Sequence, residues 1–217
     1  MMMMETATDA IGRLRRAWPQ VVVECRDVLG SELHYQAVVY HCLRDSGSVP
    51  RRQIGMNVKQ WITLPVTPLF QERDLLKNAD YRGGFEPIPD IVLFRPEIEA
   101  DWRRRNADET LRYMLVAVEI KASERAKGRL GPGEICRDLR KLDAHRAEVR
   151  HRRSTVHPDW GDLHPVMMVI DTAKLSSERM RRDALRASRD QAAELGVSFL
   201  YVSREEVWGD WAVPGEL

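Results

Sequence analysis

The stretch FEPIPDIVLF, residues 85–94, is followed after a charged connection by YMLVAVEIKAS, residues 113–123. Each contains a short run rich in Val, Ile and Leu that carries charge at one end, and such runs are typical of buried β-strands. Side chains alternate between the two faces of a strand, so Glu119 and Lys121 share one face and Ile120 points to the other. The sequence therefore predicts two strands that place charged groups at their ends.

Asp90 enters the first of these strands directly after Pro89, a residue that can begin a strand without removing an interior hydrogen bond. Charged side chains at the end of an apolar strand are costly to remove from water unless they have partners. If the two strands lie side by side, Asp90 meets Glu119 and Lys121. Two carboxylates and one lysine form a site for a hard divalent cation that prefers oxygen ligands.

Pro89-Asp90 followed by Glu119-x-Lys121 resembles the motif of the PD-(D/E)XK nuclease superfamily. Asp90 and Glu119 are 29 positions apart, and each stands on an apolar strand. The resemblance covers about residues 30–150 and implies a restriction-endonuclease-like fold, an α/β fold in which helices flank a mixed β-sheet core. Many members carry an acidic residue on the first helix, and Glu32 matches it.

The resemblance implies metal-dependent hydrolysis of DNA phosphodiester bonds, in which a cation neutralises developing charge and makes water acidic enough to attack. Asp90, Glu119 and the backbone carbonyl of Ile120 would bind Mg²⁺, with water and phosphate as further ligands, and Mn²⁺ is expected to substitute for it. Lys121 would orient or deprotonate the attacking water or stabilise charge on the phosphate, and a nearby cation would favour its neutral form. Glu32 would hold a metal-bound water or a second metal.

Each of these residues also has a simpler explanation. Asp90 and Glu119 could be strand-end charges that face solvent, and Lys121 could form only a salt bridge to one of them. Glu32 suits a first helical turn because a carboxylate there complements the helix dipole. The chain would then be a non-catalytic binding or assembly module that keeps the fold. A nuclease for RNA is a further alternative. Many members of the resembled superfamily act as dimers, so the resemblance implies a homodimer.

The charge balance of the chain limits where a nucleic acid could bind. The 217 residues include 34 Lys and Arg against 33 Asp and Glu, a net charge near +1. No global attraction to a polyanion follows, so any nucleic-acid surface must be local. Basic clusters at 103–105, 150–153 and 179–182 are candidates for backbone contacts, although charge runs are also typical of solvated faces.

Cysteine content and hydropathy indicate the compartment. The three cysteines are an odd number without a C-x-x-C pair, which indicates neither a zinc site nor a disulfide framework. A reducing compartment is favoured, and we expect a cytoplasmic protein. No stretch approaches about eighteen consecutive apolar residues, so no membrane span is predicted. Without repeats or linkers, the sequence predicts one domain over 1–217, with a helical extension over 5–30.

Helical spacing and turn residues predict the remaining elements. Pro19 is expected to end an opening helical segment, and Ser31 to cap a helix after a break at Gly30. On that helix an apolar stripe including Leu33 is expected to face the core, with Tyr35 and Gln36 on other faces. Further elements are a strand at 53–64, helices at 134–153 and 176–195, and strands at 166–170 and 197–202.

Two further groups of polar residues are weighed for the site. Lys59 and Gln60 lie near the end of the predicted strand at 53–64 and could reach the motif residues. Asp138, Lys141 and His145 form one stripe of the predicted helix at 134–153 and could steer a phosphate. Salt bridging on the helix surface explains this stripe more simply.

Overall fold

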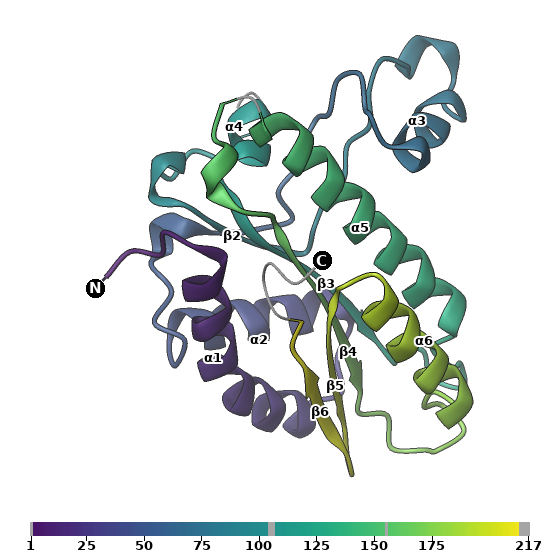
Figure 1. Ribbon diagram of the computed structural model, residues 1–217. Coiled ribbons are helices and arrows are strands. Elements are labelled where there is room, and N and C mark those ends of the chain that lie inside the picture. Colours follow the sequence, from purple (N-terminus) through teal and green to yellow (C-terminus); the bar gives the residue numbers. More distant parts are fainter. Residues whose placement is uncertain (1, 104–106, 155, 213–217) are drawn as a thin grey trace.

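A six-stranded mixed β-sheet forms the centre of the protein (Figure 1). The computed structural model describes residues 2–103, 107–154 and 156–212. The strands lie side by side in the order in which the chain forms them. They are β1 Ile54–Met56, β2 Ile91–Phe94, β3 Met114–Ala122, β4 His164–Asp171, β5 Ser198–Ser203 and β6 Val207–Asp210. Helices cover both faces of this sheet, so the mixed sheet with flanking helices predicted from the sequence is present.

The pairing of the strands changes direction in the middle of the sheet. β1, β2 and β3 are antiparallel neighbours, β3, β4 and β5 are parallel, and β6 returns antiparallel to β5. In the register of β2 and β3, Ile91 lies opposite Val118. A parallel pair requires a crossover connection, and the connection between β3 and β4 contains α5, Pro132–Ser154.

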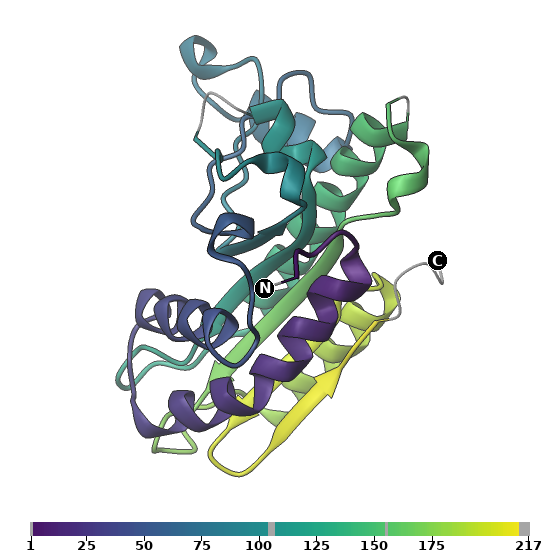
Figure 2. The ribbon, with the colours of Figure 1, turned by 90° about the vertical axis from the view of Figure 1, so that its left-hand side faces the viewer.

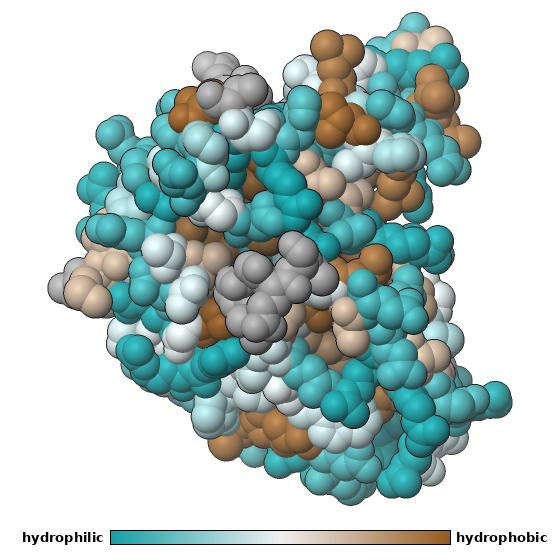
Figure 3. Space-filling model, in the orientation of Figure 1, coloured by the Kyte–Doolittle hydropathy of each residue, from teal (hydrophilic) through white to brown (hydrophobic). Residues whose placement is uncertain are grey.

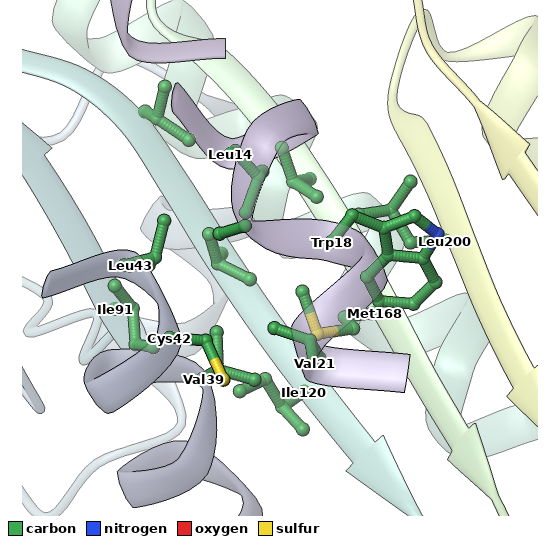
Figure 4. Packing of buried hydrophobic residues seen from close by; sticks show 14 of the residues in the cluster. Leu14, Trp18, Val21, Val39, Cys42, Leu43, Ile91, Ile120, Met168 and Leu200 are labelled. Atoms are coloured by element: carbon green, nitrogen blue, oxygen red, sulfur yellow. The ribbon is translucent and has the colours of Figure 1, made fainter. Parts of the chain in front are cut away.

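Each face of the sheet has its own helices. α1, Ala7–Asp27, and α2, Glu32–Arg44, pack on one face, and α5 and α6, Arg182–Glu194, pack on the other (Figure 2). Figure 4 shows α1 and α2 packed against β2, β3, β4 and β5 through apolar side chains. The labelled ones are Leu14, Trp18, Val21, Val39, Cys42, Leu43, Ile91, Ile120, Met168 and Leu200. No helix among the described residues is both long and apolar enough to cross a bilayer.

The prediction that Pro19 ends the first helix is wrong. Pro19 lies inside α1, which continues to Asp27. A proline in a helix interior removes one backbone hydrogen bond, but Trp18 and Val21 on either side of it are buried against the sheet. Burial of these side chains offsets the lost bond, at roughly 1.5–3 kcal/mol for a large apolar side chain. The break at Gly30 and the capping of α2 by Ser31 are confirmed.

The buried face of α2 differs from the predicted stripe. Leu33 is 63% exposed, whereas Tyr35 and Gln36 are buried. The hydroxyl of Tyr35 donates to the carbonyl of Val28 at 2.9 Å and lies 3.1 Å from the hydroxyl of Thr172. These polar contacts turn the side of α2 with Tyr35 and Gln36 toward the sheet, and not the side with Leu33 that apolar spacing predicts.

The strand predicted at 53–64 is much shorter in the structure, because β1 begins at Ile54 and ends at Met56. Asn57 has a φ of 49°, in the left-handed region that asparagine tolerates better than most residues, and it turns the chain out of the sheet. The helix predicted from 176 begins instead at Arg182. Asp171 explains the later start, because its carboxylate accepts a hydrogen bond from the Met180 amide at 2.9 Å and holds the preceding loop.

Residues 57–88 form an arm that carries α3, Pro68–Leu75, away from the sheet (Figure 1). Figure 3 shows hydrophobic atoms at the surface of this part, and Leu64, Leu75 and Leu76 are exposed there. Phe70 stacks on Phe85 with ring centroids 4.4 Å apart, and Val58, Ile62 and Phe70 are buried in the same apolar cluster as the inner face of α5. Both apolar burial and polar contacts to α5 therefore join the arm to the rest of the protein.

Glu148 of α5 holds this arm. Its side chain is fully buried, and Oε1 accepts from the amides of Val66 and Thr67 and from the Thr67 hydroxyl, each at 2.8 Å. Oε2 pairs with Arg152 at 2.8 Å. Replacing Glu148 with Ala leaves this arginine and three donors without their acceptor. We expect a loss of about 3–5 kcal/mol in the free energy of unfolding, as for other broken buried ion pairs.

Urea denaturation of the wild type and Glu148→Ala measures this loss. Glu72→Ala, on the exposed surface of α3, serves as the matched control and is expected to stay within about 0.5 kcal/mol of the wild type. A Glu148→Ala protein as stable as the control would show that the arm does not depend on this carboxylate.

Candidate functional site

Asp90 reaches across from the start of β2 to the end of β3. Its Oδ2 accepts a hydrogen bond from the backbone amide of Ile120 at 2.6 Å, and its Oδ1 accepts one from Gln36 Nε2 at 2.7 Å. Ile120 stands between Glu119 and Lys121, so the structure brings Asp90 to both residues of the second motif half. The side chain is 6% exposed, which is unlike a strand-end carboxylate that faces solvent.

Glu119 lies on the face of β3 that α5 covers, and it is only 9% exposed. No hydrogen bond or ion pair joins its carboxylate to another residue within 2–103, 107–154 and 156–212. Burial, with the neighbouring charge of Asp90, raises the pKa of Glu119 to about 8. Burial also raises the pKa of Asp90 to about 6, against the opposing effect of the Ile120 amide. The two carboxylates thus form a buried acidic pair.

Lys121 is surrounded by oxygen atoms. Its Nζ donates to both carboxylate oxygens of Glu32, at 3.0 and 3.1 Å, and to the carbonyl of Ile120 at 3.2 Å. It also pairs with Asp138 at 3.2 Å. Burial alone would lower the pKa of Lys121, but the carboxylates of Asp138 and Glu32 raise it above its ordinary value. These contacts favour an ammonium that orients water or stabilises charge, and they oppose a proton-accepting role.

The structure places all four acidic and basic candidates together. Glu32 opens α2, where its own amide donates to the Glu124 carboxylate at 2.7 Å. Its side chain approaches Lys121 from the helix that covers the opposite face of the sheet from α5. The interpretation of Glu32 as an ordinary surface residue does not describe this contact.

Asp138 belongs to the same cluster. The salt bridge predicted within the helix is present between Asp138 and Lys141, but Asp138 is buried and not on the helix surface. It is 4% exposed and joins Lys121 to Lys141, the residue three positions further along α5. His145, from the same predicted stripe, is fully buried elsewhere and lies against Phe70. Burial lowers its pKa to about 3, so it stays neutral. The stripe therefore divides into two residues at the cluster, Asp138 and Lys141, and one in the core, His145.

Sequence reasoning missed Gln36. Besides donating to Asp90, Gln36 accepts a hydrogen bond from Asn57 Nδ2 at 2.9 Å. It stands four residues after Glu32, and residues with this spacing lie on one side of a helix. This spacing was the signal that could have placed Gln36 with Glu32 at the site. Its burial depends on a carboxylate from β2, which no local pattern reveals.

Other predicted candidates lie elsewhere. The side chain of Gln60 contacts the sulfur of Met114 at 2.9 Å, at the opposite end of β3 from Lys121, and Lys59 is exposed. Arg103 pairs with Asp101, and the rest of the cluster at 103–105 lies outside the described residues. The cluster at 150–153 stands at the C-terminal end of α5, the end of that helix away from Asp138.

Asp90 and Glu119 fit a divalent cation that also binds backbone and water oxygens. Among the described residues, no group of three or more His, Cys, Asp and Glu side chains is arranged to hold a metal. Two carboxylates and the Ile120 carbonyl would supply the protein ligands in the predicted arrangement. The Glu119 carboxylate has no hydrogen-bond or ion-pair partner within the described chain, and burial raises the pKa of both acids. A bound cation would favour their ionised forms.

No family model, curated protein or solved structure matches this chain. The arrangement of Asp90, Glu119 and Lys121, with the groups that contact them, is therefore the basis for the proposed function.

Proposed function

We propose that this protein is a metal-dependent nuclease that hydrolyses phosphodiester bonds in DNA. The observation that carries the proposal is the hydrogen bond from the Ile120 amide to Asp90, because it joins two motif halves that are distant in the sequence. The order of elements also supports it. α2 precedes three antiparallel strands, and α5 then leads to a parallel β4, as expected from the resemblance to the PD-(D/E)XK superfamily.

Each residue of the site has a distinct task in this proposal. Asp90, Glu119 and the Ile120 carbonyl would hold Mg²⁺, which would neutralise charge on the phosphate and acidify a water molecule. Lys121, as an ammonium, orients the attacking water and donates to a phosphate oxygen, where charge develops in the transition state. Glu32 and Asp138 position Lys121 from two sides through their ion pairs.

Nicking of supercoiled plasmid DNA tests the proposal. The wild type is expected to nick DNA with Mg²⁺ or Mn²⁺ and to stop when EDTA is added, and Asp90→Asn is expected to be inactive with either metal. Cleavage of RNA but not DNA in a parallel digest would assign the chain to the RNA-directed alternative. If neither nucleic acid is cut and calorimetry detects no Mn²⁺ binding, the chain is a non-catalytic module.

Gln36 provides a further expectation for metal binding. Replacing Gln36 with Met removes the donor that fixes Asp90 Oδ1 while keeping the length of the side chain. Loss of such an outer partner typically weakens metal binding by about 10–100-fold, and we expect this loss in the Mn²⁺ affinity measured by calorimetry. Gln20→Met, which alters a half-buried glutamine of α1, is the matched control. Equal affinities in both variants would show that Gln36 does not position Asp90.

A further inference from the structure

Two loops lie at the edge of the sheet that holds Lys121. Residues 123–131 follow β3, and residues 172–181 follow β4. Because β3 and β4 are parallel, the loops that follow them leave the same edge. Arg129 Nε donates to the Ser177 carbonyl at 3.0 Å, and the Lys127 amide donates to Glu178 at 2.7 Å. The two loops therefore form one surface, which we call the two-loop rim.

The two-loop rim carries an excess of positive charge. It contains six basic and two acidic residues, in a chain whose net charge is only +1. Both acidic side chains accept backbone amides, Glu124 from Glu32 and Glu178 from Lys127. Lys127, Lys174 and Arg181 are exposed, and within the described part of the chain none of them pairs with a carboxylate. These cations are available to an external anion.

The cluster at 150–153 offers no comparable surface. Arg150 pairs with Asp162, and Arg152 pairs with the buried Glu148. Arg153 is 3% exposed and donates to the carbonyls of Arg112, Gly161 and Met114. Arginines whose donors are already used inside the protein contribute little to binding a phosphate. The two-loop rim thus has exposed cations without a carboxylate partner in the described chain, whereas the donors of the cluster at 150–153 are already engaged.

The two-loop rim is continuous with the site. Glu32, which pairs with Lys121, lines a small hollow of about 20 Å³ together with Arg125 and Arg129 of the first loop and with Glu124 and Glu134. Lys121 itself lies two residues before this loop begins. A phosphodiester strand that crosses the rim would therefore pass directly over the end of β3.

We propose that the two-loop rim binds the phosphodiester backbone of a nucleic acid and leads it to Lys121. Its link to cleavage depends on the proposed nuclease function, but binding by the rim does not. Exposed lysine and arginine side chains bind phosphates mainly by displacing condensed cations, so the affinity of the rim for nucleic acid falls as salt rises. Its contacts are to the backbone and are independent of base sequence.

Fluorescence anisotropy with a short labelled DNA duplex in EDTA tests the rim without catalysis. Reversing two charges in Lys127→Glu/Lys174→Glu is expected to weaken binding at least about 10-fold, and to reduce the slope of log affinity against log salt by about 2, since each phosphate contact contributes about 0.9. Lys127→Ala/Lys174→Ala, which removes the charges without reversing them, is expected to lower the affinity and the salt slope by smaller amounts than the charge reversal does. The same titrations with an RNA duplex show which nucleic acid the rim prefers.

Arg51→Glu/Arg52→Glu is the matched control, because it makes the same change in net charge away from the site. Arg51 and Arg52 precede β1, whereas Asn57, which contacts Gln36 at the site, follows β1. We expect this control to stay within about threefold of the wild type, because salt screens charges that lie far from the bound strand. Equal weakening by the control and the loop variant, or no binding by the wild type, overturns the inference. Binding through the rim without cleavage by the wild type would overturn the nuclease proposal alone.

Discussion

Replacing Lys121 with Met should lower Mg²⁺-dependent nicking of plasmid DNA by roughly 10²–10³-fold, the usual effect of removing one donor that stabilises transition-state charge. The methionine keeps the apolar part of the side chain and removes the ammonium, which contacts Glu32, Asp138 and the Ile120 carbonyl. Asp90 and Glu119 stay in place, so Mn²⁺ binding measured by calorimetry should change far less than the cleavage rate.

Lys141→Met is the matched control for Lys121→Met. Both lysines pair with Asp138, so each substitution removes one cation from the same carboxylate. Only Lys121 also contacts Glu32 and the Ile120 carbonyl at the end of β3. We expect Lys141→Met to retain cleavage within about tenfold of the wild type. If the two variants lose activity equally, the effect comes from the total charge of the cluster and Lys121 has no special role.

The sequence predicted the strands of the site because their patterns are local. Residues 85–94 and 113–123 combine apolar runs with charged ends, and both form strands close to the predicted positions. The helix predicted at 134–153 is confirmed as α5 for the same reason, since its apolar residues recur at helical spacing. Alternation along β3 also placed Glu119 and Lys121 on one face. These features depend only on neighbouring residues.

Features that depend on distant partners could not be predicted in this way. Gln36 is buried because Asp90 and Asn57 satisfy its amide. These two residues lie 54 and 21 positions further along the chain, outside α2. Asp138 is buried because Lys121 meets it from β3. The start of α6 is delayed by a hydrogen bond to Asp171 on another element. In each case a polar group from elsewhere in the fold determines the burial or boundary of the element.

Glu119→Gln should make the protein more stable than the wild type at alkaline pH, although it removes a proposed metal ligand. The folded protein holds a proton on Glu119 up to a pKa of about 8, whereas the unfolded chain releases it near the ordinary value of 4.5. This carboxyl therefore contributes stability at low pH that is lost as the pH rises toward 8. Between the ordinary pKa of 4.5 and the folded pKa of about 8, the free energy of unfolding decreases by about 1.4 kcal/mol per pH unit.

Glutamine has nearly the same shape as glutamic acid but carries no charge, so the variant avoids this loss. Thermal unfolding in EDTA is expected to give similar melting temperatures for the variant and the wild type at pH 5 and a higher one for the variant at pH 8.5. Both proteins contain the buried histidines His145 and His164, so the acid sensitivity of these residues cancels in the difference. Glu72→Gln, a substitution on the exposed surface of α3, should have a melting temperature close to that of the wild type at both pH values.

Addition of Mg²⁺ should reverse the order of the two proteins at pH 8.5. A cation that binds only the folded state raises the melting temperature by an amount that grows with the logarithm of its concentration relative to its dissociation constant, and it needs Glu119 ionised beside Asp90. The wild type is therefore expected to gain stability with Mg²⁺, while Glu119→Gln gains little and shows no nicking. If Mg²⁺ stabilises both proteins equally, the cation binds elsewhere. A variant less stable than the wild type at every pH would mean that the carboxylate is ionised and satisfied in the folded protein.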